Sequence, residues 1–528
     1  MTTITSSRPA VRPGRAGFTH LLRAEWTKFR TVRGWVIAIF VATLVTLLLG
    51  LFIGSHSHVA PCTDGPNGPA CRYIIPTGPG GEAVTDTFYF VHRPLTADGS
   101  ITARVTSLTE VTESGTTPQG GPAHTQPVVV PWSKAGLIVT AGSGQGSAYA
   151  AVMVTGGHGT RIQWNYTGDT PGLAGRVSAA SPGWLRLTRA GDVITGYDSA
   201  DGTSWTKIGT VTLPGLAPAV QAGLFAASPG SAQQLSQQIT SAFGNGAPAD
   251  ATATFDRVGL RGGWPGSSWT GTSVNAGPDS PYTTGHEAGY RQADGAFTVT
   301  GSGDIAPDVT DGVPIDIVFA GMFIALVAVL VVGAQFMTAE YRRGLIRVTV
   351  AASPRRGRVL AAKAIVLGAV TFAAGLAGAA AAVLIGTPLL RASGNPLYPA
   401  TAFTEVRVIA GTAALIAVLA VFALGVGAIL RHGAGAVAAA ITAIILSYLL
   451  SAAIPVLPEG AADWVLRVTP AAGFAIRQVI PAYPQVAASY TPFNDYFPLA
   501  PWVGFAVTCG YAALTLALAT YLLHRRDA

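Results

Sequence analysis

Only four lysines, Lys28, Lys134, Lys207 and Lys363, are available to contact nucleotide phosphates. A loop that cradles the phosphates of ATP carries its lysine as Gly-Lys-Ser/Thr, because the glycine lets the backbone approach the phosphates closely. Here the lysines follow Thr, Ser, Thr and Ala, and none follows Gly. The sequence therefore predicts no ATP-binding loop, no enzymatic activity and no cofactor in this chain itself.

Two of the three cysteines are placed so that a disulfide can join them. Cys62 and Cys71 have eight residues between them, whereas Cys509 lies alone near the C-terminus. In an oxidising compartment such a pair forms a disulfide, and in a reducing one it remains two free thiols. No His or further Cys stands nearby at the spacing that zinc requires, so no metal site is predicted.

Composition indicates a membrane protein. The chain has 528 residues, 49% apolar and 11% charged, with a mean hydropathy of +0.42 and a net charge of +7. A soluble chain normally carries about twice that charged fraction. The basic excess sits in residues 1–33 and 338–363, each beside a long apolar run. That placement is typical of cytoplasmic loops and differs from the basic face of a soluble nucleic-acid binder.

Six apolar runs are long enough to cross a membrane, because about 20 helical residues span a hydrocarbon core of about 30 Å. They cover residues 35–54, 317–339, 364–390, 408–430, 434–454 and 502–523. A cleaved signal peptide is the alternative for the first run. That run is longer than the apolar part of a signal peptide and 34 residues precede it, so a permanent anchor is expected.

Basic residues predict the orientation of these spans in the plasma membrane. Residues 1–34, 340–363, 431–433 and 524–528 together hold 17 Lys/Arg against three acidic residues. Since cytoplasmic loops carry the excess of basic residues, both termini are expected in the cytoplasm. Residues 55–316 are then expected outside the cell.

The long insert, residues 55–316, has the pattern of an all-β domain. Short alternating stretches, at 100–107, 135–140, 149–155, 184–189 and 193–197, are separated by Gly, Ser, Thr and Asp. Strands this short with turn residues between them predict an antiparallel β-sandwich. The Asp-Gly at 201–202 suits a tight hairpin, because glycine readily takes a positive φ.

The run WLRLTRAGDVITGYDSADGTSWTKIGTV, followed by VQAGLFAAS and ATFDRVGL, resembles concanavalin-A-like sandwich domains over about residues 84–260. Some members of that group bind sugars and others hydrolyse them. Glycoside hydrolysis needs two opposed carboxylates, and the E-x-D-x-E strand of the related glucanases is absent. The absence of that strand argues against a glycosidase. The resemblance leaves carbohydrate binding or peptide binding open.

Two charged segments flank the first spans. Residues 18–32 have apolar residues at three-to-four spacing with a basic polar face, which predicts an interfacial amphipathic helix. Residues 340–347 (EYRRGLIR) and 351–363 (AASPRRGRVLAAK) form a basic loop between spans two and three. The alternative is that both segments serve only as orientation signals.

These two segments, with the six spans, resemble the permease subunit of a type-2 ATP-binding-cassette (ABC) exporter of the actinobacterial type. In that family the N-terminal helix and the loop between spans two and three dock on a separate ATPase. The resemblance implies a docking role for Glu25, Lys28, Arg30, Glu340, Tyr341, Arg342, Arg343, Gly344, Arg347, Arg355 and Arg356. The long insert departs from the family pattern, so its role cannot be inherited.

The resemblance also implies a second permease copy and a re-entrant outer helix at about residues 463–480. An ATPase partner would hold the ATP and magnesium. Lipids, amphipathic drugs or peptides are the substrate classes that mostly apolar spans allow. The alternative function is a non-transporting sensor or adhesion receptor that displays the β-sandwich, and such a receptor needs no docking loop.

Overall fold

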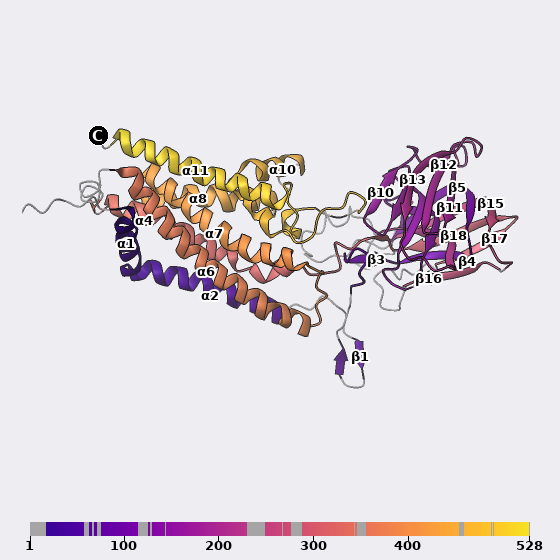
Figure 1. The fold of residues 1–528 in the computed structure, drawn as a ribbon, viewed down its shortest axis with the longest axis horizontal. Helices are drawn as coiled ribbons and strands as arrows, with labels where there is room; N and C mark the ends of the chain where they lie inside the picture. The colour runs from indigo at the N-terminus through magenta and orange to yellow at the C-terminus, as the bar shows by residue number, and fades with distance from the viewer. Residues whose placement is uncertain are drawn as a thin grey trace, which may run out of the picture.

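The computed structural model describes residues 17–56, 63–65, 68–70, 75–113, 125–126, 129–142, 144–229, 249–266, 268–275, 288–342, 344–345, 355–452, 459–486, 488 and 490–526. Helices gather at one end of an elongated molecule and strands at the other (Figure 1). The expected fold class, an α-helical membrane protein with an all-β domain, is confirmed.

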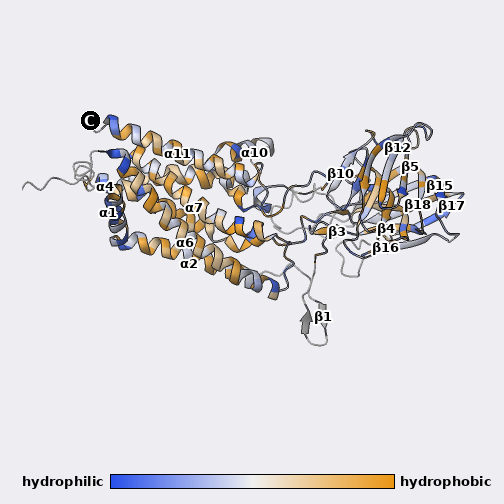
Figure 2. Cartoon of the chain, in the orientation of Figure 1, coloured by the Kyte–Doolittle hydropathy of each residue, from blue (hydrophilic) through white to orange (hydrophobic). Residues whose placement is uncertain are grey.

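In the part of the chain that the structure describes, six helices are long and apolar enough to cross a membrane. They are α2 (Arg33–His56), α4 (Met322–Arg342), α6 (Arg356–Ala392), α7 (Ala402–Leu430), the run of α8 (Gly433–Ile441) with the π-helical turn η2 (Thr442–Leu446) and α9 (Ser447–Ala452), and α11 (Pro501–Arg526). Hydrophobic residues extend along the whole bundle (Figure 2). Apolar residues on all sides are what helices surrounded by lipid and other helices require.

The helix α6 begins earlier than the apolar run that marks it in the sequence. That run starts at residue 364, whereas α6 begins at Arg356, so Lys363 lies about two turns inside the helix. Arg, Leu, Ala and Lys are all good helix formers, and Pro354 stands just before the first turn. Hydropathy thus locates the hydrocarbon-spanning part, while helix propensity decides where the helix starts.

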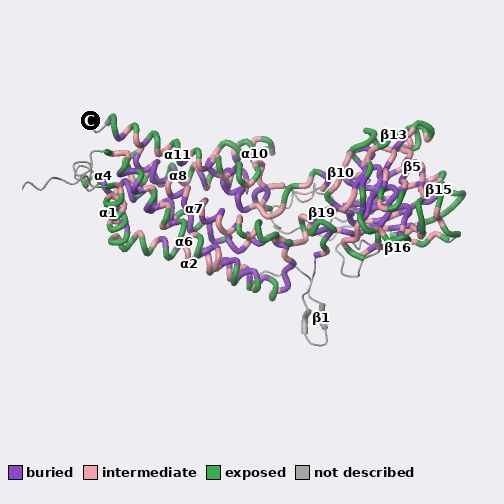
Figure 3. Tube along the Cα trace, viewed as in Figure 1, coloured by how far each residue is buried: buried purple, intermediate pink, exposed green. Residues whose placement is uncertain are grey.

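The helix α7 is the centre of the bundle and contacts α4, α6, α8 and α11. Leu415, Leu419 and Leu424 on α7 are fully buried, and the buried residues lie inside the bundle (Figure 3). A Cβ atom at Gly333 of α4 would stand 2.5 Å from the carbonyl oxygen of Ala420. The backbones of α4 and α7 therefore touch at this glycine.

Two large antiparallel sheets form the β domain. One has the strand order β10-β9-β8-β7-β14-β4-β16, and the other has the order β13-β12-β11-β5-β15-β18-β17 with β6 beside β5. The bounds are β3 (Val84–Asp86), β4 (Phe88–Leu95), β5 (Gly99–Glu113), β6 (Thr125–Gln126), β7 (Lys134–Thr140), β8 (Tyr149–Thr155), β9 (Thr160–Trp164), β10 (Gly168–Pro171), β11 (Gly183–Ala190), β12 (Val193–Ser199), β13 (Thr206–Thr212), β14 (Val220–Ala227), β15 (Ala249–Gly262), β16 (Thr270–Val274), β17 (Gly289–Ala293), β18 (Ala296–Ser302) and β19 (Ile305–Pro307).

The sheets pack face to face as a β-sandwich. Leu137 and Val152 from one sheet and Leu187 and Phe255 from the other are buried in the layer between them. Alternate residues of each strand point into this layer, which is the period-two pattern that the sequence shows. A short hairpin of β1 (Thr63–Gly65) and β2 (Gly68–Ala70) precedes the sandwich. Cys62 and Cys71 lie outside the described residues, so their pairing stays a prediction.

The β domain contacts the helical bundle through its connecting chain and one outer loop. Val313 forms a backbone bridge with Leu397, and the hydroxyl of Tyr398 donates to Asp308 over 3.3 Å. The amide of Gln485 donates to the carbonyl oxygens of Tyr166 and Thr167, at 3.3 and 3.2 Å. The loop that carries Gln485 follows the helix α10 (Glu459–Val468) and the 3-10 helix η3 (Pro470–Arg477). The predicted outer helix, about 463–480, falls on these two helices.

Candidate coupling site at the bundle end away from the β domain

Four charged side chains meet at one end of the bundle. The helix α1 lies at this end, which is the one farthest from the β domain (Figure 1). Glu25 and Lys28 come from the helix α1 (Phe18–Thr31), Glu340 from α4 and Lys363 from α6. The ammonium of Lys363 donates to a carboxylate oxygen of Glu25 and to one of Glu340, both at 2.7 Å. The ammonium of Lys28 donates to the same two carboxylates, at 2.8 and 3.0 Å. These four residues are called the ion-pair cluster below.

The ion-pair cluster is mostly buried. Glu25 and Lys363 are fully buried and Glu340 is 6% exposed, whereas the side chain of Lys28 is 42% exposed. Two carboxylates and two ammonium groups balance in charge, so no net charge is buried. Loss of one member leaves an uncompensated buried charge, which typically costs 3–5 kcal/mol. The cluster therefore ties α1 to α4 and α6.

Electrostatics at Lys28 agree with this arrangement. Partial burial lowers the pKa of the Lys28 ammonium, but the hydrogen bonds and negative charges of Glu25 and Glu340 outweigh that effect and raise its pKa above the ordinary value. Lys28 is thus fully protonated at neutral pH. It closes the solvent side of the cluster.

Aromatic rings cover the inner side of the ion-pair cluster. Phe336 of α4 lies 5.5 Å from Phe29 and 5.2 Å from Trp35, both edge-to-face, and the ammonium of Lys363 lies 4.4 Å from the centre of the Phe336 ring. Glu25 and Phe29 are four residues apart on α1, so they share one face of that helix. This face packs on the bundle, and the rest of α1 faces outward.

The residues that the family resemblance assigned to ATPase docking fall into two groups. Glu25 and Glu340 are buried in the ion-pair cluster, and Tyr341 is half-buried with its ring 5.0 Å from the guanidinium of Arg431. Exposed residues at the same bundle end are Arg30, Arg342, Gly344 and Arg355, and Lys28 is half-exposed. Arg356 donates to the carbonyl oxygen of Leu523 at the end of α11. Arg343 and Arg347 lie outside the described residues.

Lys363 is the member of the cluster that the sequence did not single out. In the sequence Lys363 stands directly before the apolar run 364–390, where a lysine normally reaches water. One sequence feature could have indicated its role. Lys363 is a lone lysine at the start of an apolar run, and α1 and α4 each carry a single acidic residue. The pairing itself depends on the packing of α1 across α4 and α6 and cannot be read from spacing.

A second buried charged group lies toward the β-domain end of the bundle. The guanidinium of Arg477 in η3 lies 3.9 Å from a carboxylate oxygen of Asp316 and 3.9 Å from one of Asp495. The rings of Phe323 and Phe474 flank it, with centres 6.0 and 5.6 Å away. This group fixes η3 against the chain that enters α4.

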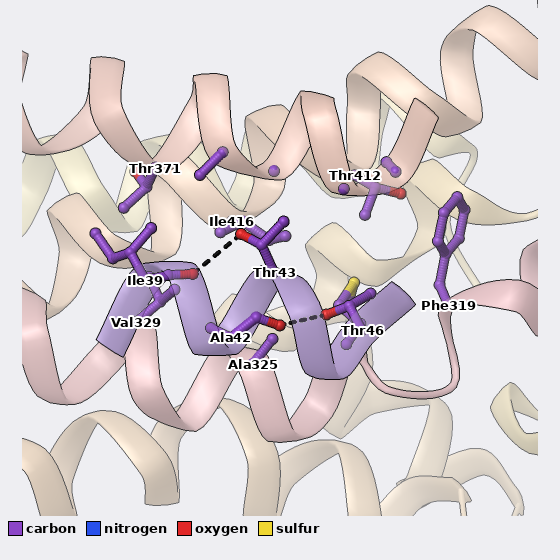
Figure 4. A pocket seen from close by; sticks show the side chains of 15 residues that line it. Ile39, Ala42, Thr43, Thr46, Phe319, Ala325, Val329, Thr371, Thr412 and Ile416 are labelled. Atoms are coloured by element: carbon purple, nitrogen blue, oxygen red, sulfur yellow. Dashed lines mark hydrogen bonds between the residues drawn. The ribbon is translucent and has the colours of Figure 1, made fainter. Parts of the chain in front are cut away.

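The bundle also encloses a small cavity between α2, α4, α6 and α7 (Figure 4). Thr43 and Thr46 satisfy their hydroxyls on the carbonyl oxygens of Ile39 and Ala42. The cavity has a volume of about 30 Å³. It can hold one or two water molecules and is too small for a drug-sized molecule. Within the part of the chain that the structure describes, no group of three His, Cys, Asp or Glu residues could hold a metal ion.

Comparison with known proteins identifies the bundle. A family described as "ABC-2 family transporter protein" matches residues 224–528, which is more than half of the chain. No curated protein matches the sequence. A solved structure of a functionally unknown protein from Saccharomyces cerevisiae is similar at 14% identity, covering 36% of this chain and 82% of that one, with a TM-score of 0.22.

A second solved structure, scytalido-glutamic peptidase with a transition state analog inhibitor, is similar at 8% identity, covering 42% of this chain and 99% of that one, with a TM-score of 0.26. Both structural likenesses are too weak to support a fold or a function for the β domain. The family match is stronger evidence, because it covers five of the six long apolar helices found in the described residues. It also includes the charged residues of both buried groups of the bundle, apart from Glu25 and Lys28, which precede the matched region. This chain belongs to the ABC-2 family of transporter proteins.

Proposed function

We propose that the chain is the permease of an ATP-driven exporter in the plasma membrane, with both termini and the ion-pair cluster in the cytoplasm and the β domain outside. Membership of the ABC-2 family makes it a membrane component of an ABC transporter and implies an ABC ATPase partner. Export as the direction, lipids, drugs or peptides as cargo, and a second permease copy belong to the proposal.

The ion-pair cluster is the observation that carries this proposal. ATP-driven movement of a partner must reach the spans through something that contacts both. The helix α1 lies across the bundle end and is joined to α4 and α6 by buried ion pairs of 2.7 Å. A force on α1 or on the loop after α4 therefore moves two spans together. In this proposal Glu25 and Glu340 position the docking surface instead of forming it.

The exposed part of that bundle end supplies the contact itself. Lys28, Arg30, Arg342 and Arg355 are basic and reach solvent there. A basic patch favours an acidic surface on the ATPase, and charges at an interface rim mainly set the rate of association.

The distribution of charge in the spans supports an external power source. In the described residues of the six spans, every Asp, Glu, Lys and Arg lies within about two turns of a helix end. Carriers driven by protons or sodium place ionisable residues in the middle of the membrane. Such a relay is missing from the described spans.

Co-purification separates this proposal from the alternative receptor. The full chain is extracted in mild detergent from its native membranes, and the ATP hydrolysis of the purified material is measured. We expect a stoichiometric ATPase subunit, and less of this subunit and less hydrolysis in Arg342→Glu and Arg355→Glu, because a reversed charge slows association. Arg391→Glu is the matched control, because Arg391 is exposed at the other end of α6. Material without an ATP-hydrolysing subunit would support the receptor instead.

A further inference from the structure

Among the described residues, nothing covers one face of the β-sandwich. On the sheet of β4, β7, β8 and β14, the outward residues Phe90, Ile138, Met153 and Phe225 are buried. On the other sheet, the outward residues of β5, β11, β12 and β13 are half-buried or exposed. They include threonines, two tryptophan-stacked arginines and a lysine. This exposed surface, centred on Arg104, Trp184, Arg186, Tyr197, Trp205 and Lys207, is called the arginine face.

Arg186 is held rigidly on the arginine face. Its guanidinium lies 3.8 Å from the centre of the Trp205 ring, and its Nε donates to the hydroxyl of Thr102 over 3.3 Å. Trp205 follows the β12–β13 turn, in which Gly202 has φ +77°. Asp201 accepts two backbone N–H groups of that turn, which fixes its shape. Stacking keeps the guanidinium plane fixed before any ligand arrives.

Trp184 organises two more arginines beside Arg186. The guanidinium groups of Arg104 and Arg257 each lie 5.7 Å from the centre of its ring. Arg104 forms an ion pair with Asp256 on β15. Arg257 is exposed and has φ +49°, at an irregularity in the pairing of β15 with β5. Bulges of this kind commonly redirect a side chain, and here the bulge turns Arg257 over the indole.

The arginine face carries more positive than negative charge. Among the described residues, no carboxylate lies within ion-pair distance of Arg186, Arg257, Arg261 or Lys207. Burial, and then the charge of Arg261, lower the pKa of Arg186. Like charges gathered without partners repel one another, and an anionic ligand would remove that repulsion. Elsewhere the insert is acidic, so the excess is local.

Rows of hydroxyl groups run across the strands next to these arginines. The register of β5, β11, β12 and β13 places Ser100, Thr188, Thr195 and Thr210 in one line. The hydroxyls of Thr195 and Thr210 are 3.1 Å apart. Neighbouring strands are about 4.8 Å apart, so the hydroxyl groups repeat at close intervals across the sheet. Each hydroxyl can donate or accept a hydrogen bond.

We propose that the arginine face binds an anionic polysaccharide. Fixed guanidinium groups suit the paired oxygens of carboxylate or sulfate, and the hydroxyl rows suit the ring hydroxyls of an extended sugar chain. Protein interfaces also use Trp, Tyr and Arg, but their buried core is apolar, whereas Trp184 and Trp205 lie here under arginine guanidinium groups. Among the described residues of these strands, Val193 is the large apolar side chain that is exposed, at 37%. This ligand goes beyond transport and rests on the proposed outward placement of the β domain.

The test uses the full chain in nanodiscs of zwitterionic lipid, with fluorescent alginate, a carboxylate polysaccharide, as the probe. The double variant Arg186→Gln/Arg257→Gln is expected to bind at least about 10-fold more weakly, since each lost charge-assisted hydrogen bond alone is worth about that factor. Arg186→Lys keeps the charge but loses the planar stack, so an intermediate loss is expected. Arg176→Gln is the control, because Arg176 is exposed in the loop between β10 and β11.

Three competitors decide the class of ligand. Neutral dextran, a single-stranded oligonucleotide and vesicles of anionic phospholipid are each titrated against bound alginate. The proposal expects the weakest competition from dextran, and weaker competition from the oligonucleotide and the vesicles than from unlabelled alginate. Equal binding of dextran, stronger binding of the oligonucleotide or vesicles, or unchanged alginate affinity in the double variant would overturn it. None of these outcomes depends on an ATPase, so failure here leaves the transport proposal standing.

Discussion

Lys363→Met removes one charge from the ion-pair cluster while it preserves the packing around it. Methionine is nearly as long as lysine and its thioether packs well against the ring of Phe336. The variant loses the two 2.7 Å hydrogen bonds to Glu25 and Glu340. Lys28 then remains as the cation shared by the two carboxylates. The expected result is that α1 detaches from the bundle far more often.

The size of the effect follows from burial. Breaking a buried ion pair costs about 3–5 kcal/mol. The lower end applies here, because Lys28 persists and one of the carboxylates can take up a proton. About 3 kcal/mol corresponds to more than a 100-fold rise in the open population. When opening and closing are fast, proteolysis follows that population.

Limited trypsin cleavage after Arg23 and Arg30 of α1, in the full chain in nanodiscs, measures this opening. We expect a rise of about 100-fold in Lys363→Met and none in Arg391→Met, whose side chain is exposed at the far end of α6. The double variant Lys363→Met/Glu25→Gln restores charge balance and should recover most of the protection. Unchanged cleavage in Lys363→Met, or additive losses in the double variant, would show that the ion-pair cluster does not hold α1 on the bundle.

Four further outcomes are expected. In a cysteine-free background, Ala219→Cys in the β domain should label with an impermeant maleimide on intact cells, whereas Leu345→Cys should label only after permeabilisation; the reverse pattern contradicts the proposed orientation. A non-reduced digest of the native chain should contain a peptide linked through Cys62 and Cys71, and finding both as free thiols would exclude it. Burial raises the pKa of Asp311 to about 7 and that of Asp86 to about 6. The folded state therefore binds more protons than the unfolded state between about pH 4 and 7, and the free energy of unfolding should fall as pH rises through that window. Asp311→Asn should flatten the dependence of the melting temperature on pH, and an equal slope in that variant would contradict the assignment. Gly333→Ala places a Cβ 2.5 Å from a carbonyl oxygen and should cost about 1–3 kcal/mol, whereas Gly510→Ala on α11, with nothing within 4 Å, should not lower the melting temperature.

The elements of the fold follow from local sequence patterns. The five stretches expected as strands lie in β5, β7, β8, β11 and β12, because short runs rich in β-branched residues between turn residues are a local signal. The six long helices carry enough apolar residues to be recognised by length alone. The helix α6 starts at Arg356, before the apolar run that begins at residue 364, because residues of high helix propensity extend the helix beyond that run.

The candidate site depends on tertiary packing and was only partly predictable. Glu25 and Glu340 stood out as single acids in basic segments, and the family resemblance gave them a role at a surface. The structure instead buries both against Lys363, which is 338 residues from Glu25 and 23 from Glu340. A hydropathy profile places such a lysine at the edge of a membrane span and gives it no partner. Only the crossing of α1 over α4 and α6 shows that it has two partners.

Photo-crosslinking can show whether an ATPase docks at the bundle end that carries the ion-pair cluster. Benzoylphenylalanine is placed at Arg355, just before α6, and in a matched chain at Arg391, exposed at the other end of that helix. After irradiation of native membranes, we expect the Arg355 position to capture a subunit that hydrolyses ATP and the Arg391 position to capture none. Capture of such a subunit at Arg391, or at neither position, would contradict it.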